Sequence, residues 1–133
     1  MVVFYCLLQL AEEEKPPTDL IYSATLISLP IAPNTEAWHK ARSVVTGPLK
    51  SAWSGNDWVL ALMARMAIHV SSICSPVIHS NAVQGDMAIK QPAGLGEIQI
   101  DGVQNVDLSD LLEGHMDLAK ADKLKTVFQR VEG

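Results

Sequence analysis

Two residues of this sequence, Asp57 and His115, have the types and positions that acid–base chemistry needs. Asp57 closes the stretch Ser-Gly-Asn-Asp between a short apolar run and an amphipathic segment, and His115 follows a later apolar run. A carboxylate beside an imidazole fixes the tautomer of the ring and stabilises its protonated form. Asp57 also has a simpler interpretation, because aspartate is among the commonest residues at a helix N-cap. The elements around the two residues must decide between these roles.

Other side chains with suitable chemistry receive structural interpretations. Asp107 and Asp110 are alternative acids, but they are expected to cap turns around the loop that carries His115. Ser23 and Ser28 lie within a predicted strand. A nucleophilic serine of an α/β enzyme sits on a sharp strand-to-helix turn, so neither serine is expected to be a nucleophile.

The remaining histidines and the cysteines do not predict a metal site. His69 and His79 lack any ligand spacing with cysteine or carboxylate, and neither a metal nor a cofactor is predicted. Cys6 and Cys74 lie in different segments with apolar or small neighbours. This usage favours reduced thiols that fill the core of a cytosolic domain over a disulfide.

The residues before Asp57 alternate between helical and strand patterns. Apolar residues at helical spacing over residues 2–14 predict a helix that the two following prolines end. Residues 20–30, LIYSATLISLP, form a short apolar run typical of a buried strand in a parallel sheet. Asn34 is the predicted cap of a second helix, which ends at Gly47-Pro48.

The same cycle repeats towards the carboxyl terminus. Residues 49–54 form a second predicted strand, and helical spacing follows from Trp58 to about residue 72. Residues 73–94 carry turn formers without a clear period, so a long surface excursion is predicted. A third strand is predicted near residues 97–100 or 103–108. The stretch EGHMDLAKADKLKTVFQRV predicts a final helix with an apolar stripe at Leu118, Leu124, Val127 and Val131.

This alternation predicts an α/β fold with parallel strands and places Asp57 and His115 at one edge of the sheet. Helices that connect parallel strands bring the carboxyl ends of those strands to the same edge, where ligand chemistry occurs. Asp57 follows the second strand and His115 follows the third, 58 positions later (115 minus 57). The Asp57 carboxylate and the His115 imidazole are therefore expected to approach to about 2.6–3.5 Å.

Composition limits the classes of function. The chain has 133 residues, 48% of them hydrophobic, and a net charge of −5, which argues against a nucleic-acid partner. The amino terminus lacks the basic residues and the cleavage site of a signal peptide, so a secreted protein is not predicted. Residues 58–78 are apolar but are interrupted by Arg65 and His69, which argues against a spanning helix. A cytoplasmic or membrane-associated protein is the expectation.

Two stretches resemble a known family. The segments SLPIAPNTEAWHKARSVVTGPLKSAWSGNDWVLALMAR and GVQNVDLSDLLEGHMDL resemble the carboxyl-terminal half of an α/β-hydrolase-like family called domain of unknown function 726. That family includes the transmembrane and coiled-coil domain-containing proteins. The similarity runs from about residue 2 to residue 130, apart from the excursion at 73–94. Its most specific residues are Ser54, Asn56, Asp57, Trp58, Asn105, Val106, Asp107, Ser109, Asp110, Gly114 and His115.

The resemblance implies a partial α/β-hydrolase fold, with residues 1–133 forming one domain of about three parallel strands and flanking helices. The chain order in that fold is nucleophile, acid, histidine, and the resemblance matches Asp57 to the acid and His115 to the histidine. In the family a helix like VVFYCLLQLA directly follows the nucleophile turn. The resemblance therefore implies that the chain starts about four residues beyond that serine, and the nucleophile, the earlier strands and the oxyanion loop are expected outside it. The chain resembles a serine hydrolase without its nucleophile, and we expect it to be inactive alone.

Two functions remain open. The first is the carboxyl-terminal part of a lipase- or esterase-like serine hydrolase, whose complete protein would take a lipid or ester substrate and associate with membranes through other segments. The second is a non-catalytic interaction module that binds a partner protein in membrane trafficking. A Gly-x-Ser-x-Gly turn encoded upstream would favour the first function, and a native start at Met1 would favour the second.

Overall fold

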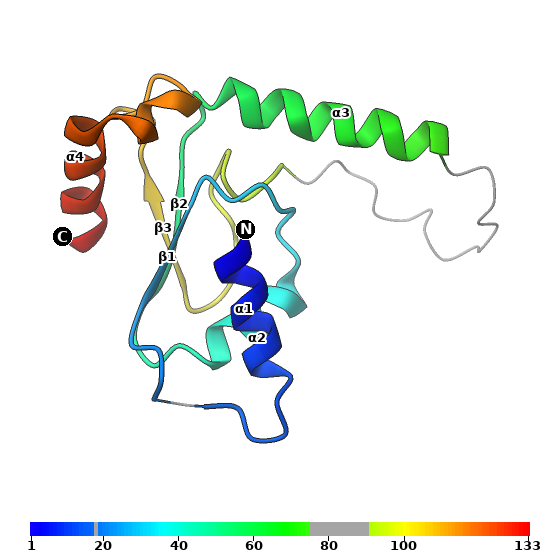
Figure 1. Ribbon diagram of the computed structural model, residues 1–133, viewed down its shortest axis with the longest axis vertical. Helices are drawn as coiled ribbons and strands as arrows, with labels where there is room; N and C mark the ends of the chain where they lie inside the picture. Colours follow the sequence, from blue (N-terminus) through cyan, green and yellow to red (C-terminus); the bar gives the residue numbers. More distant parts are fainter. Residues whose placement is uncertain (18, 75–90) are drawn as a thin grey trace.

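The computed structural model describes residues 1–17, 19–74 and 91–133, and side chains are described everywhere in these ranges except 67–74. Helices and strands alternate along the chain, as Figure 1 shows. The elements are α1 (Val2–Ala11), β1 (Ala24–Ile27), α2 (Thr35–Ser43), β2 (Leu49–Trp53), α3 (Trp58–Cys74), β3 (Val103–Asp107), the 3₁₀ helix η1 (His115–Ala119) and α4 (Ala121–Glu132).

The strands form one parallel sheet in the order β1-β2-β3. Leu49 of β2 pairs with Ala24 of β1 on one side and with Val103 of β3 on the other. The predicted fold of three parallel strands with flanking helices is confirmed. Because the strands are parallel, the β2–α3 loop and the β3–η1 loop leave the sheet at the same edge.

Apolar side chains cover both faces of the sheet because they alternate along the strands. In β1, Leu26 belongs to the larger hydrophobic cluster, whereas its neighbour Ile27 packs against the smaller one. Leu49 and Ala52 of β2 divide between the clusters in the same way. Figure 1 shows α1 and α2 on one side of the sheet and α4 on the other.

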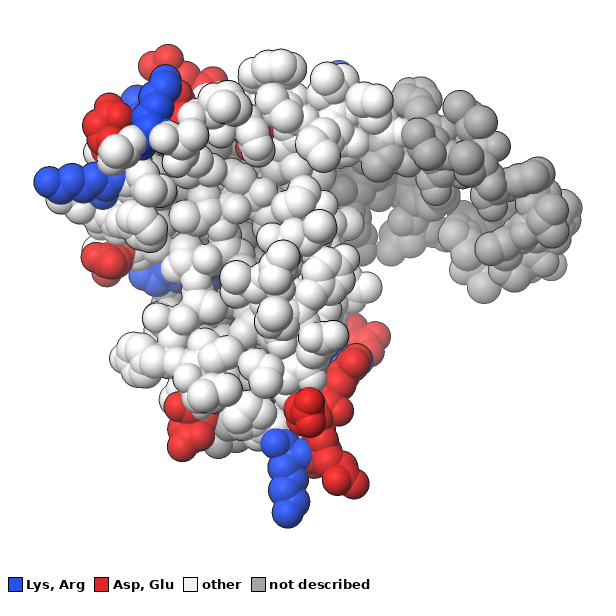
Figure 2. All heavy atoms as spheres, viewed as in Figure 1, with Lys and Arg blue, Asp and Glu red and all other residues white. Residues whose placement is uncertain are grey.

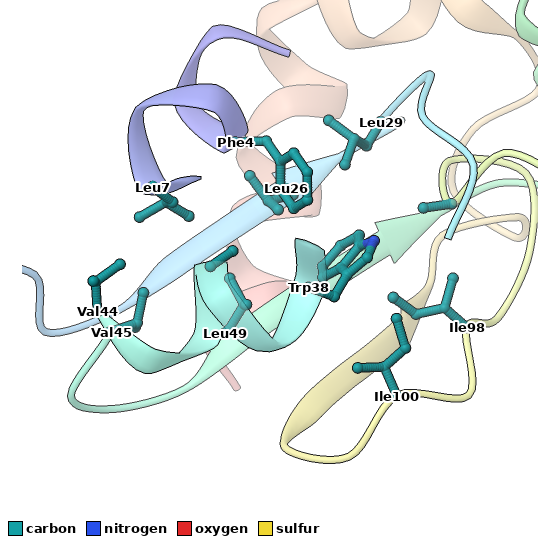
Figure 3. Packing of buried hydrophobic residues seen from close by; sticks show 12 residues of the cluster. Phe4, Leu7, Leu26, Leu29, Trp38, Val44, Val45, Leu49, Ile98 and Ile100 are labelled. Carbon is teal, nitrogen blue, oxygen red and sulfur yellow. The ribbon is translucent and has the colours of Figure 1, made fainter. Parts of the chain in front are cut away.

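The larger cluster lies between the sheet and the helices α1 and α2, and Figure 3 shows its packing. Trp38 of α2 is fully buried, and its ring centroid lies 5.0 Å from that of Phe4 in α1, with the rings tilted at 51°. Asn34 caps α2 as predicted, with its Oδ1 accepting the amide hydrogen of Ala37 at 3.1 Å. The other buried members are Leu7, Leu26, Leu29, Ala41, Val44, Val45, Leu49, Ala93, Ile98 and Ile100.

The smaller cluster joins α4 to the opposite face. Val127 and Val131 of α4 pack with Ala52, Leu108 and Leu112. The prediction of one continuous final helix is wrong, because η1 ends at Ala119 and α4 begins at Ala121. The physical reason is the extended backbone of Lys120 (φ −89°, ψ 124°), whose ammonium binds the carboxylate of Asp117 and closes the short turn.

Several helices and strands are shorter than predicted. The first helix ends at Ala11, before the prolines, and α2 ends at Ser43 instead of Gly47. Residues after Ser43 bond back towards β1: the Gly47 amide donates to the carbonyl of Tyr22 at 2.6 Å. Neither Ser23 nor Ser28 lies within a strand, because they flank β1, and Ser28 has a φ of 50°.

The predicted excursion at residues 73–94 falls largely outside the described residues, which omit 75–90. Its last residues include Ala93 and Gly94, which are buried. The amide of Gly94 donates to the carbonyl of Leu29 at 2.9 Å, and its carbonyl accepts from the amide of Ser54 at 3.1 Å. A Cβ on Gly94 would overlap the backbone of Ser28, so only glycine fits this crossing.

The expectation that Cys6 fills the core is wrong, since Cys6 is exposed. Helix α1 turns the face carrying Phe4 and Leu7 towards the sheet, and residues between them point away from it. Cys74 ends α3, and its side chain lies outside the description.

Candidate active site

Asp57 is the N-cap of α3 and is buried, with 2% of the residue exposed. Its Oδ1 accepts the amide hydrogen of Leu60 at 2.9 Å, and its backbone carbonyl accepts that of Ala61 at 3.0 Å. These bonds satisfy amides that would lack partners at the start of a helix. The capping interpretation of Asp57 is therefore confirmed.

The same carboxylate contacts His115, the first residue of η1. The ring Nδ1 lies 2.9 Å from Oδ2 of Asp57 and 3.1 Å from Oδ1. The approach expected from the sequence is present, across 58 positions of the chain. The Asp57 side chain is 3% exposed and that of His115 is 43% exposed, so the carboxylate is enclosed while the ring reaches solvent.

This contact assigns the protons of the imidazole. A carboxylate only accepts hydrogen bonds, so Nδ1 must carry the hydrogen that it donates to Asp57. In the neutral ring Nε2 then holds a lone pair and can accept a proton.

Backbone bonds align the two loops that carry the pair. The amide of Leu108 donates to the carbonyl of Trp53 at 2.8 Å, which continues the pairing of β2 and β3 by one residue. The amide of Gly55 donates to Oγ of Ser109 at 3.0 Å. These contacts fix the loop before Asp57 against the loop that leads to His115.

The alternative acids have structural partners. Oδ1 of Asp107 accepts the amide hydrogen of Ser109 at 2.8 Å, which is the turn-capping role predicted from the sequence. Asp110 pairs with Arg130 of α4 at 2.7 Å. The hydrogen bond from this guanidinium lowers the pKa of Asp110 below its ordinary value.

Asp117 is a buried carboxylate that sequence reasoning gave no role. Its Oδ2 accepts the amide hydrogen of Glu113 at 2.8 Å, and its Oδ1 accepts from Nζ of Lys120 at 2.6 Å. The Lys120 bond and then the Glu113 amide hold the pKa of Asp117 below its ordinary value. Asn56 and Ser109 were also missed as linking residues, although both lie in the stretches that resemble the family. Their partners lie 53 to 56 positions away, so no local pattern could identify these contacts.

Within the described ranges, no serine hydroxyl is hydrogen-bonded to His115, and no group of three or more His, Cys, Asp or Glu residues could hold a metal ion. None of the helices in these ranges is long and apolar enough to cross a membrane.

Two hollows lie at the other end of the sheet, near the amino ends of the strands. They have volumes of about 220 and 630 Å³, and Lys50 lines both. The Lys50 ammonium donates to the carbonyl of Val131, and Nε of Arg42 donates to that of Gly102 at 3.1 Å. These cations bind backbone carbonyls and so tie the fold together at this end.

The chain is similar to segments of several much longer proteins. An uncharacterized membrane protein of Schizosaccharomyces pombe is 31% identical over 86% of this chain and 12% of its own length. The transmembrane and coiled-coil domain-containing protein STS1 of Oryza sativa subsp. japonica is 27% identical over 86% of the chain and 14% of its own. The probable lipase MIL1 of Saccharomyces cerevisiae is 28% identical over 90% of the chain and 9% of its own.

The matched part of the chain thus spans 12%, 14% and 9% of the length of these relatives. No solved structure matches it. The profile of one family matches residues 1–132, which is nearly the whole sequence. The chain belongs to the DUF726 family, described as proteins of unknown function.

Proposed function

We propose that Asp57 and His115 are the acid and the general base of a serine-hydrolase site that cleaves an ester, with the nucleophilic serine supplied from outside these 133 residues. The observation that carries the proposal is the bond between Nδ1 of His115 and the buried carboxylate of Asp57 at 2.9 Å. The pair lies where two parallel strands end, which is the edge at which α/β enzymes bind ligands.

In the proposed reaction, the serine hydroxyl gives its proton to Nε2 of His115 while its oxygen attacks the ester carbonyl carbon. The imidazolium then gives this proton to the alkoxide of the ester, which departs as an alcohol, and the acyl group stays bound to the serine. Water then attacks the acyl-enzyme by the same proton transfers, and the carboxylic acid product is released. Asp57 keeps its charge throughout and holds the ring in the tautomer with Nδ1 protonated.

Two further observations support this function. The order acid then histidine along the chain is that of α/β hydrolases, and one relative is named a probable lipase. Other relatives are named membrane proteins, so we propose a lipid ester as the substrate of the complete protein and a membrane as its site of action.

The test uses a chimera in which this chain replaces the matching segment of the Schizosaccharomyces pombe relative. The chimera is treated with a fluorophosphonate probe, which labels activated serines. We expect labelling of the chimera and no labelling of the isolated chain. The substitutions Asp57→Asn and His115→Ala should each slow labelling about 100-fold or more, because general acid–base catalysis contributes at least that factor.

The unsubstituted relative is the positive control, and circular dichroism establishes that each variant is folded. Labelling that survives both substitutions would overturn the proposal. Labelling of the relative but not of a folded chimera would overturn it as well, since the chain would then not supply a working acid and base.

A non-catalytic interaction module is the second candidate, favoured by exposed apolar side chains on α3. Trp58, Leu62, Met63 and Met66 are 64%, 50%, 58% and 57% exposed. Figure 2 shows Lys, Arg, Asp and Glu gathered mainly at the upper left and the lower end of the face in view, with a broad area between them that lacks these residues. The exposed apolar side chains of α3 suit a membrane or an apolar partner.

Flotation of the chain with phosphatidylcholine vesicles tests whether α3 is a binding surface that works independently of the Asp57–His115 pair. If α3 binds lipid, the double variant Leu62→Gln and Met66→Gln should float several-fold less than the parent, whereas Asp57→Asn should float equally. Equal flotation of the double variant and the parent would remove α3 as the binding surface. A matched control, His39→Gln, changes an exposed position on α2.

A further inference from the structure

The side chain of Asn56 bridges the two loops of the proposed site. Its Nδ2 donates to the carbonyl of Ser109 at 2.7 Å and to that of Leu112 at 3.0 Å. Asn56 directly precedes Asp57, and Leu112 lies three residues before His115. One amide therefore connects the segment that carries the acid to the segment that carries the base.

The chemistry of the partners requires an amide at this position. Both partners of Asn56 are carbonyl oxygens, which only accept, so the –NH₂ group must face them and both of its hydrogens are used. A carboxylate of the same shape would offer no hydrogen and would place negative charge against two carbonyl dipoles. Asparagine can therefore make both bonds and aspartate can make neither, although the two side chains have nearly the same volume.

A second side chain, that of Asp117, also holds the segment that carries His115. The Asp117 carboxylate accepts the amide hydrogen of Glu113 at 2.8 Å and binds Lys120. Asn56 fixes the carbonyl of Leu112, and Asp117 fixes the next amide along the chain. His115 follows this anchored peptide unit by two residues and lies between Glu113 and Asp117 in the chain. The distance from its ring to Asp57 therefore depends on where the two side chains hold the backbone.

We propose that Asn56 is the positioning residue of the Asp57–His115 pair: its amide fixes the turn after β3 at the place from which His115 reaches the carboxylate. Asn56 does not contact the ring itself, and its role in catalysis rests on the proposed function. Its role in holding the pair together does not, because that role is a property of the folded chain alone.

The test compares Asn56→Asp with Asn34→Asp in the complete 133-residue chain. Asn34 uses its oxygen to cap α2, so aspartate can replace it without loss. Long-range ¹H–¹⁵N spectra at pH 9 report the ratio of Nδ1–H to Nε2–H tautomers of neutral His115. We expect Asn56→Asp to lower this ratio about tenfold, because the His115 ring then loses its hydrogen bond to the charged Asp57 carboxylate. Asn34→Asp should leave the ratio unchanged.

A second variant covers the case in which Asn56→Asp does not fold. Asn56→Ala removes both donors without adding charge, and it should lower the tautomer ratio in the same direction. A ratio equal to that of the parent in a folded Asn56→Asp or Asn56→Ala variant would overturn the proposal, because the pair would then persist without the bridge.

A measurement in the chimera separates this proposal from the proposed function. Asn56→Asp should slow fluorophosphonate labelling about tenfold, matching the change in tautomer ratio. A changed ratio with labelling that survives Asp57→Asn and His115→Ala would uphold the positioning role and reject the hydrolase. An unchanged ratio would reject the positioning role whatever the labelling.

Discussion

The α1–α2 core and the edge that carries Asp57 and His115 are held together by different forces. In the core, Phe4 and Trp38 are 1% and 0% exposed and pack through apolar contacts. At the edge, loops distant in sequence are joined by hydrogen bonds, and the His115 side chain is 43% exposed. Apolar burial supplies most of the free energy of folding, whereas directional bonds specify geometry. Substitutions in the two regions should therefore fail in different ways.

The largest expected effect is in the core. Trp38→Ala should lower the free energy of unfolding by about 3–5 kcal/mol, because it leaves a cavity under α1 and α2. Its indole Nε1 has no hydrogen-bond partner among the described residues, so the loss measures packing alone. Urea unfolding followed by circular dichroism measures the change. His39→Ala, at the exposed neighbouring position, should shift the value by less than about 0.5 kcal/mol. A loss below about 1 kcal/mol for Trp38→Ala would contradict the core described above.

A smaller effect is expected at the edge, where Asp57 has two tasks that can be separated. Asp57→Ala removes the cap of α3 and should cost about 1 kcal/mol in the free energy of unfolding. Asp57→Asn keeps a capping oxygen and should cost less, since asparagine and aspartate cap almost equally well. Equal costs for the two variants would mean that the cap contributes nothing and that the charge against His115 carries the whole effect.

Low pH should destabilise the folded chain through the protonation of Asp117. Its folded pKa lies below the ordinary value of 3.8, so its contribution to stability is fully present above that pH and is lost as the pH falls through the folded value. Unfolding midpoints measured from pH 6 downwards should therefore decline below about pH 4, and Asp117→Asn should make this decline shallower. Asp110→Asn should change the decline less, because the Asp110 side chain is 60% exposed and solvent screens its ion pair. Identical acid profiles for Asp117→Asn and the parent would count against a stabilising role for the Asp117 carboxylate.

The smallest effect is expected at Ser51 in β2. Its Oγ is fully buried and has no hydrogen-bond partner among the described residues. Removing an unsatisfied polar atom costs little or stabilises, so Ser51→Ala should leave the urea midpoint unchanged or raise it slightly. A loss above about 1 kcal/mol would indicate a bond that Ser51 makes through a buried water.

Features set by local pattern could be predicted from the sequence. The order of elements, the cap at Asn34 and the parallel sheet follow from periodicity, short polar cap residues and the alternation of strands with helices. The approach of Asp57 to His115 followed from the rule that parallel strands end at one edge. Their catalytic roles remain a proposal.

Features set by specific hydrogen bonds that run against the apolar pattern could not be predicted. The final helix has a continuous apolar stripe, but the bonds of Asp117 to Glu113 and Lys120 divide it into η1 and α4. Gly94 looks like a loop residue in the sequence, yet it is buried because its backbone crosses that of Leu29. In the first case hydrogen bonds between residues three and four positions apart interrupt the helical pattern. In the second a contact with a distant strand end overrides the loop signal.

One oxygen of Asp57 accepts hydrogen bonds from two donors, so the exchange rate of one of them, a backbone amide, reports on the contact with the other. Oδ1 lies 2.9 Å from the amide nitrogen of Leu60 and 3.1 Å from Nδ1 of His115. Without the ring, the carboxylate gains rotational freedom and leaves the Leu60 amide more often, so His115→Ala should speed deuterium exchange at that amide. Leu60 lies 55 positions before the histidine (115 minus 60) and has no bond to it. The deuterium exchange rate of the Leu60 amide therefore reports whether the Asp57 carboxylate is bound to the His115 ring. This single rate can follow the formation of the pair in the absence of any substrate.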